Sequence, residues 1–298
     1  MRITNNMVTN SVLTELQQLN TQQSTLQAEV SSGLAVTQPS DNPSVFGQFI
    51  QEEGQSSQLA QFSKNAAQAL NLAQASYSGL NSLTQIYDNA TQLATEGTGT
   101  LGTGANAGYA DELNQLIEQA VSVANTQVNG NYLYAGTAVD KPPFTATTDS
   151  TGKITSVSYV GNSGQAAIPL SPTSSINPST TGATNSGLAD MINNMIAVRD
   201  AMTGGDTAAV SAAAQTLNGS EEVLSSAAAE NGAIQLGIQS EQTQEQSNST
   251  NLASLMSSQT NADLPTTITR LDQTQLAYQA AMETAAKVLQ LSITQYIP

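Results

Sequence analysis

The 298-residue chain contains no cysteine, no histidine and no tryptophan. Without cysteine, it has neither a disulfide framework nor thiolate chemistry. Without histidine, it lacks the side chain that most often serves as a general base or metal ligand near neutral pH. We therefore expect a protein that is not an enzyme, with no catalytic residue, no metal site and no cofactor.

Basic residues are also scarce, because seven Lys and Arg stand against 23 Asp and Glu, a formal net charge of −16. Such an acidic surface repels phosphate backbones and anionic lipids, so we expect no nucleic-acid partner. No apolar run approaches the length of a membrane span, and the first residues lack the apolar segment of a signal peptide. We expect neither membrane insertion nor a cleaved signal.

What the chain does contain is helix-forming sequence with few large side chains. Only 39% of its residues are hydrophobic and 4% are aromatic, and much of the polar remainder is Gln, Asn, Ser and Thr. This mixture suits helices packed on one another better than a large globular core.

Near both ends of the chain, mainly apolar side chains recur in alternating steps of four and three residues, which is the spacing of a coiled-coil seam. Gln23, Gln275 and Ser292 interrupt the two seams with polar side chains. We expect the two segments to pair antiparallel and to complete their burial against copies in other subunits. The predicted subunit and coiled-coil interface consists of Val12, Leu16, Leu19, Leu26, Val30, Leu264, Ile268, Leu271, Tyr278, Met282, Ala285, Leu289 and Tyr296.

Between these seams, the spacing of apolar residues predicts further helices over about 43–96, 110–128, 188–202 and 206–258. The segment 132–187 is instead rich in Thr, Ser, Gly and Pro, with β-type runs "NYLYAG", "KITSVSYV" and "QAAIPL". The predicted fold is mainly α, a long antiparallel helical rod with coiled-coil terminal helices and a small inserted β domain. The expected divisions are 1–42 and 261–298 for the terminal coiled coil, 43–131 and 188–260 for the rod, and 132–187 for the β domain.

The stretch "QPSDNPS" separates the first seam from the next predicted helix. Pro43 suits a first helical position, with Asn42 before it as the N-cap. We interpret Pro39, Ser40, Asp41, Asn42 and Pro43 as an interdomain turn. The "GTGTLGTG" run at 97–104 contains a G-x-G-x-x-G match, but no β-α-β unit surrounds it, so we interpret it as an interhelical loop.

Four longer stretches resemble the bacterial flagellin superfamily. They are "SSGLAVTQPSDNP" (31–43), "VNGNYLYAGTAVDKPPF" (128–144), "SYVGNSGQAAIPL" (158–170) and the terminal "ADLPTTITRLDQTQLAYQAAMETAAKVLQLSITQYI". The resemblance extends over essentially the whole chain. The opening "MRITNNM", the "NYLYAG" segment and the ending "LSITQYIP" are unlike those of flagellin itself and favour the hook-associated members.

This resemblance implies a flagellin-like fold and a structural, extracellular subunit of the bacterial flagellum that connects hook to filament. It also implies export through the channel of the flagellum without a cleaved signal. The partners that it implies are the first hook-associated junction protein, flagellin, copies of the chain in a ring, and an export chaperone. Two alternatives stay open, a flagellin-type filament subunit and a surface adhesin or binding module that acts through the β domain.

Overall fold

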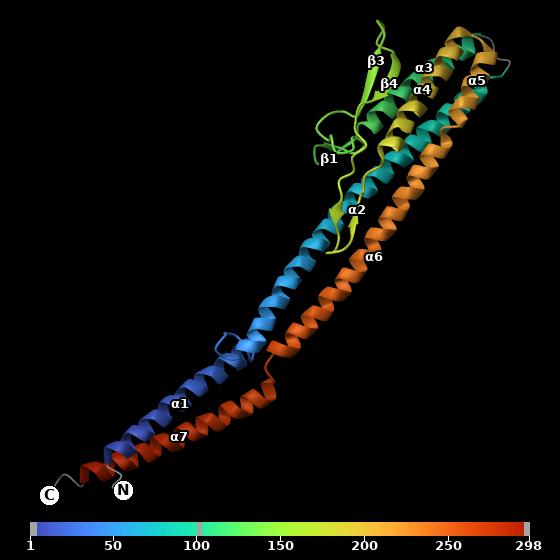
Figure 1. Ribbon diagram of the computed structural model, residues 1–298. Coiled ribbons are helices and arrows are strands. Elements are labelled where there is room, and N and C mark those ends of the chain that lie inside the picture. The colour runs from blue at the N-terminus through green and yellow to red at the C-terminus, as the bar shows by residue number, and fades with distance from the viewer. Residues whose placement is uncertain (1–4, 100–102, 295–298) are drawn as a thin grey trace. The chain divides into compact units, whose positions relative to one another are not determined.

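The computed structural model describes residues 5–99 and 103–294. Its helices are α1 (Asn5–Ser32), α2 (Pro43–Gly97), α3 (Thr103–Ala124), α4 (Gly182–Gly204), α5 (Thr207–Asn218), α6 (Glu221–Thr260) and α7 (Leu264–Thr294) (Figure 1). Its strands are β1 (Gln127–Val128), β2 (Asn131–Tyr132), β3 (Phe144–Thr148), β4 (Ile154–Tyr159), β5 (Ile168–Pro169) and β6 (Ser175–Ile176). The predicted class, mainly α with a small β part, is confirmed.

The chain forms two compact units. The terminal unit comprises residues 1–57 and 249–298, and the central unit comprises residues 58–248. The first turns of α2 and the last turns of α6 therefore belong to the terminal unit, together with α1 and α7.

The helix expected over 206–258 is wrong in one respect, because the structure divides it into α5 and α6. Asp206 caps the start of α5 by accepting hydrogen bonds from the amides of Ala208 and Ala209. The helix ends at Asn218, and the Ser220 amide donates to the Leu217 carbonyl at 2.8 Å. Gly219 is a poor helix residue, and α6 begins directly afterwards with two glutamates, which the dipole of a helix start favours.

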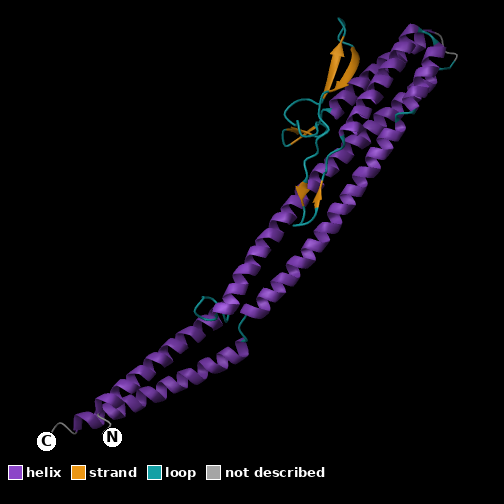
Figure 2. Ribbon diagram, viewed as in Figure 1, coloured by secondary structure: helices purple, strands orange, loops and turns teal. Residues whose placement is uncertain are grey.

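The strands form three separate two-stranded antiparallel sheets, β1–β2, β3–β4 and β5–β6 (Figure 2). The three predicted β-type runs contain β2, β4 and β5, whereas β1, β3 and β6 lie outside these runs. Asn129 and Gly130 join β1 to β2, and both have positive φ angles, 53° and 83°. Asn-Gly is the pair that tolerates this conformation in a tight hairpin turn.

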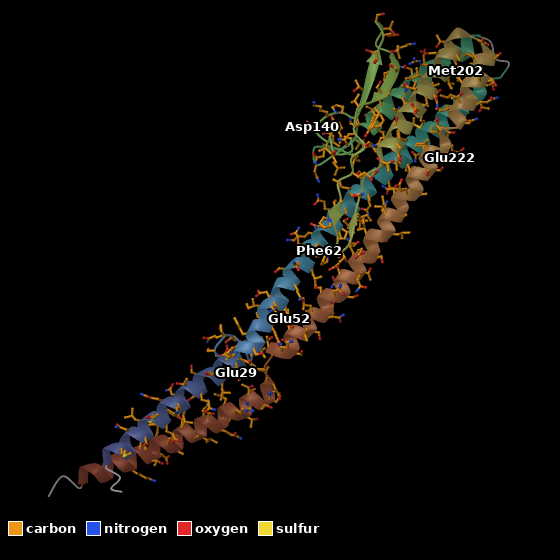
Figure 3. The ribbon with its side chains drawn as sticks, in the orientation of Figure 1. Glu29, Glu52, Phe62, Asp140, Met202 and Glu222 are labelled. Atoms are coloured by element: carbon orange, nitrogen blue, oxygen red, sulfur yellow. The ribbon has the colours of Figure 1, made fainter. Side chains whose placement is uncertain are left out.

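The central unit holds the main hydrophobic core, to which α2, α3, α4, α5, the first turns of α6 and the strands β3 and β4 contribute. Leu83 of α2, Ile117 of α3 and Ile192 of α4 are all fully buried in it. The end of α2 lies very close to α4, since a Cβ on Gly97 would lie 2.6 Å from the terminal methyl carbon of Met202, which is labelled in Figure 3. A larger residue at position 97 would have to displace the flexible end of the Met202 side chain.

Two asparagines hold the β3–β4 hairpin against the helices. Asn125, just after α3, accepts from the Phe144 amide at 3.0 Å and donates to the Phe144 carbonyl at 2.9 Å. Asn193 of α4 makes the same pair of bonds to Val157, at 2.9 and 2.8 Å. Each carboxamide thus takes the place of a neighbouring strand at one residue of the hairpin.

Candidate functional site

The terminal unit contains the predicted interface residues. α1 and α7 lie side by side in it and run antiparallel (Figure 1). Among the described residues of this unit, Leu26 is the only buried hydrophobic side chain, with 7% of its surface exposed. The helix pair therefore has a thin apolar core of its own.

On α1, the structure shows the periodicity that the sequence predicts. Val12, Leu16, Leu19 and Val30 are all half-buried, and Leu26 is buried, whereas most residues between them are exposed. The residues with reduced exposure recur in steps of four and three. One face of α1 therefore makes the contact.

On α7, the face with reduced exposure differs from the predicted seam at alternate positions. Leu271, Tyr278 and Ala285 are half-buried, as expected for contact residues. Two threonines complete this face, Thr267 with 6% and Thr274 with 7% of their surfaces exposed. Each lies one residue before a predicted seam position, and the half-buried Ala281 continues the pattern. Leu289 belongs to α7, but its side chain lies outside the described residues, as does the whole of Tyr296.

The other predicted α7 residues face solvent in the single chain. Leu264, Ile268 and Met282 have 41%, 45% and 49% of their surfaces exposed. At ~100° per residue these three positions share one side of the helix, next to the side that contacts α1. We call these three residues the α7 stripe. Leu276, with 66% exposed, lies on another side of the same helix.

The turn between α1 and α2 is organised around Asp41. Its Oδ2 atom accepts hydrogen bonds from the amides of Thr37 and Gln38, at 3.0 and 2.9 Å, and from the Thr37 hydroxyl at 3.1 Å. The two amide bonds stabilise the carboxylate and lower the pKa of Asp41 below its ordinary value. Asn42 accepts from the Val45 amide at 3.2 Å, and α2 begins at Pro43, so the predicted cap and helix start are confirmed.

Backbone bonds tie this turn to the junction between α6 and α7. α1 ends at Ser32, and Gly33 follows with a φ of +73°, the left-handed conformation that glycine tolerates best. The Ala35 amide donates to the Thr260 carbonyl at 2.7 Å, and the Ala262 amide donates to the Gly33 carbonyl at 2.9 Å. Pro39 and Ser40 lie exposed at the tip of the turn. Two breaks far apart in the sequence thus hold each other in place.

In the central unit, the "NYLYAG" segment is anchored by Tyr134. Its hydroxyl donates to the Ser76 carbonyl of α2 at 2.9 Å, and burial raises the pKa of this phenol to about 12. Asn185 of α4 donates to the Tyr134 carbonyl at 2.9 Å. The sequence analysis singled out the segment but missed Asn185, because a polar residue on a helix carries no signal of a long-range bond.

Arg199 of α4 is a second anchor that the sequence analysis missed. Its Nη1 atom donates to the Ile154 carbonyl of β4 at 2.7 Å and to the Asn114 side chain of α3 at 2.9 Å. Its Nε and Nη2 atoms bond the Asp200 carboxylate at 2.9 and 2.7 Å. The arginine is 4% exposed, so its charge is compensated within the fold.

Over residues 5–99 and 103–294, no group of three His, Cys, Asp or Glu side chains is placed to hold a metal ion. None of the helices described for the chain has a stretch long and apolar enough to cross a membrane. The arrangement of the described residues is one of contact faces and anchors.

Comparison with known proteins gives consistent results. Residues 3–139 match the bacterial flagellin N-terminal helical region. Flagellar hook-associated protein 3 of Salmonella typhimurium is 31% identical over 120 residues, which cover 39% of this chain and only 37% of the Salmonella protein. By its name, that relative is associated with the flagellar hook.

Solved structures share the fold. A hook-associated protein structure from Vibrio parahaemolyticus superposes with a TM-score of 0.66 at 18% identity, covering 74% of this chain and 100% of that one. The FlgL protein of Bacillus cereus gives a TM-score of 0.60 at 17% identity, over 69% and 98% of the two chains. FlgL of Xanthomonas campestris gives 0.56 at 14% identity, over 68% and 98%.

The sequence match and the shared fold lead to the same group of proteins. We conclude that residues 3–139 are similar to the bacterial flagellin N-terminal helical region, and that the chain resembles flagellar hook-associated protein 3 in sequence.

Proposed function

We propose that this chain is a structural subunit of the bacterial flagellum that connects hook to filament. The observation that supports this most directly is the α7 stripe, because three large apolar side chains on one side of a helix stay exposed in the single chain. Large apolar side chains that share one exposed side of a helix suit a contact with another molecule. The similarity to hook-associated protein 3 supplies the biological setting.

In this proposal, the terminal unit makes the contacts between subunits. The eleven predicted interface residues whose side chains the structure describes then have two roles. Those on the α1–α7 contact hold the helix pair together, and Leu264, Ile268 and Met282 pack against neighbouring subunits. Neighbouring copies in a ring, the first hook-associated protein and flagellin are the proposed partners. Export without a cleaved signal and the help of an export chaperone belong to the same proposal.

We also propose the functional divisions predicted above, with 1–42 and 261–298 as the assembly domain, 43–131 and 188–260 as the rod, and 132–187 as the β domain. The turn at residues 39–43 would then mark the passage from assembly domain to rod. Limited proteolysis of the purified chain, read by mass spectrometry, tests these limits. Cuts that fall inside the divisions rather than near residues 42, 131, 187 and 260 would contradict them.

The functional test combines a gene deletion with a charge placed on the α7 stripe. Deletion should leave intact hooks without filaments and release flagellin into the medium. Ile268→Glu should be exported and folded yet fail to restore filament attachment, because the charge cannot be buried in a subunit contact. Gln273→Glu is the matched control, since it adds the same charge on another side of α7 and should restore attachment.

Other outcomes would favour the alternatives. Filaments that remain attached in the deletion strain would overturn the junction proposal. Growth of long filaments from the purified chain alone would favour a filament subunit. If removal of residues 132–187 abolished adhesion and left motility intact, the hypothesis of a surface adhesin would be favoured instead.

A further inference from the structure

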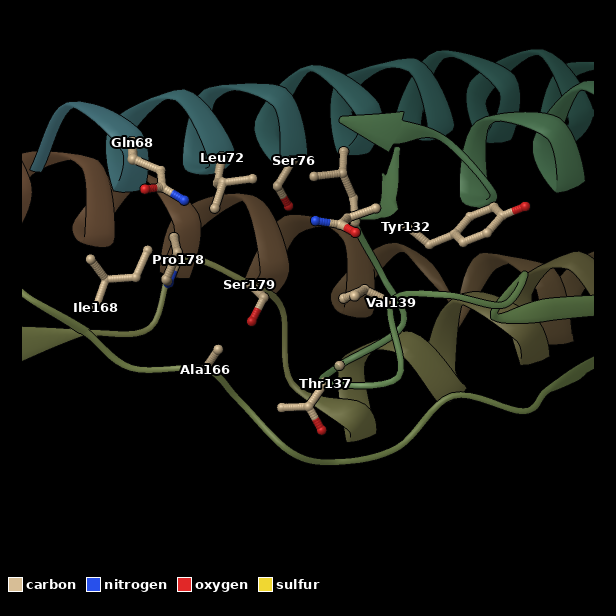
Figure 4. A pocket seen from close by; sticks show the side chains of 13 residues that line it. Gln68, Leu72, Ser76, Tyr132, Thr137, Val139, Ala166, Ile168, Pro178 and Ser179 are labelled. Atoms are coloured by element: carbon tan, nitrogen blue, oxygen red, sulfur yellow. The ribbon is translucent and has the colours of Figure 1, made fainter. Parts of the chain in front are cut away.

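A cavity of about 340 Å³ lies within the central unit, between α2, the loop after β2 and the segments around β5 and β6 (Figure 4). Gln68, Leu72 and Ser76 of α2 line it at intervals of four residues. At ~1.5 Å of rise per residue, these positions extend over about 12 Å of helix. The cavity is therefore long enough for an extended chain rather than a single compact group.

The lining is apolar and uncharged. Leu72, Leu133, Val139 and Ile168 are among its hydrophobic members, and Gln68, Thr137 and Ser179 are among its polar members. None of the described lining residues carries a charge, in a chain whose net charge is −16. An anion would meet no cation there and would be repelled by the protein as a whole, so the chemistry favours an uncharged ligand.

Among the described lining residues, only Ser76 has a buried side-chain polar atom without a partner. It is only 2% exposed, and its hydroxyl oxygen has no hydrogen-bond partner among the described residues. Figure 4 shows this side chain directed from α2 into the cavity. A buried hydroxyl without a partner costs free energy, and a ligand carbonyl that accepts its proton would offset that cost.

We propose that this cavity binds an uncharged, mainly aliphatic molecule that presents a carbonyl oxygen to Ser76. Its size follows from the volume, because an engineered apolar cavity of about 150 Å³ holds benzene, and roughly twice that volume suits about a dozen non-hydrogen atoms. All the residues involved belong to the central unit, so the proposal is independent of assembly through the terminal unit.

Octanamide and octanoate test this, because they share an aliphatic chain and differ in charge. The full chain, labelled with ¹⁵N, is titrated with each probe, and binding is followed through its amide signals. Octanamide should shift the signals of residues near 72–76, 133–139 and 166–179 in a saturable way, and octanoate should not. Ser76→Ala should weaken octanamide binding about fivefold, as expected for one net hydrogen bond.

A blocking variant and a matched control complete the experiment. Ala166 is an exposed lining residue, so Ala166→Phe should fill the cavity without disturbing the core and should abolish binding. Leu236→Ala removes a leucine that is 69% exposed and is not part of the lining, and it should bind octanamide normally. The proposal is overturned if octanoate binds as tightly as octanamide, if Ala166→Phe retains binding, or if octanamide gives no saturable shifts up to its solubility limit.

Discussion

Replacement of Leu26 by Ala should loosen the terminal unit and leave the central unit unchanged. Leu26 is the single buried hydrophobic side chain among the described residues of the terminal unit. A buried Leu→Ala replacement costs about 2–5 kcal/mol, and the cost falls toward the lower limit where the surroundings can collapse or admit water. The contact face of α7 carries two threonines and sits in a thin core, so we expect about 2 kcal/mol for this site.

Amide hydrogen exchange of the purified chain measures this effect segment by segment. A loss of about 2 kcal/mol raises the population of the open form roughly 30-fold. Peptides from 10–30 and 264–285 should therefore exchange about 30 times faster in Leu26→Ala, with no change in peptides from α4. Leu13→Ala is the matched control, because Leu13 is 52% exposed on the same helix and should alter exchange no more than about twofold.

Two results would refute this reasoning. If Leu26→Ala accelerated exchange equally in α4, the terminal unit would not open separately from the rest of the chain. If exchange in α1 and α7 did not change, Leu26 would contribute nothing to their association, and the contact face described here would be wrong.

Three further predictions concern single polar groups. Asn193→Ala should lower stability by about 2 kcal/mol in urea denaturation, because it leaves the Val157 amide and carbonyl without their partner. Tyr134→Phe should cost about 1 kcal/mol in the same assay, through loss of its 2.9 Å hydrogen bond. In the parent chain this phenol has a raised pKa of about 12, so it ionises more readily in the unfolded state, and stability should decline as pH rises from about 10 to 12, a decline that Tyr134→Phe reduces. Asp41 has a lowered pKa, so its contribution is present above the ordinary carboxyl pKa and is lost as pH falls through the lowered value; the Thr37 amide signal should shift with pH in that range, and Asp41→Asn should abolish the shift.

The points at which some helices begin and end were predictable from the sequence, because they depend on neighbouring residues. Asn42 and Pro43 begin α2 for reasons contained in four or five residues, and the Gly205 break after α4 is equally local. The division between α5 and α6 was missed, because the apolar pattern continues on both sides of Gly219.

The contact face of α7 was harder to predict because periodicity alone cannot choose between adjacent positions. Ile268 and Met282 are the larger hydrophobic residues and fit a seam of steps of four and three. The structure instead turns Thr267 and Thr274 inward and leaves those two exposed. Threonine brings a methyl group in a small side chain, which suits a close helix pair. A pattern of apolar residues thus predicts a broad face of the helix. The helix that packs against it determines which residues of that face are buried.

The anchors of the β3–β4 hairpin could not be predicted from sequence. Asn193 bonds a residue 36 positions away, and Asn125 bonds one 19 positions away. Asparagine elsewhere in the chain is common and mostly exposed, so its identity does not reveal which copies bridge to a strand. The cavity beside Ser76 depends in the same way on segments that only folding brings together.

The two asparagines that bracket this hairpin also bear on how the protein behaves when crowded. A pair of strands exposes unpaired amides and carbonyls that can recruit a strand from another molecule and begin aggregation. Asn125 occupies these groups at Phe144 on one strand, and Asn193 occupies them at Val157 on the other. Because one residue on each outer edge is already paired, a strand from another molecule finds fewer consecutive groups with which to form hydrogen bonds. Where many copies of the protein are packed densely, their hairpins should therefore resist pairing with one another.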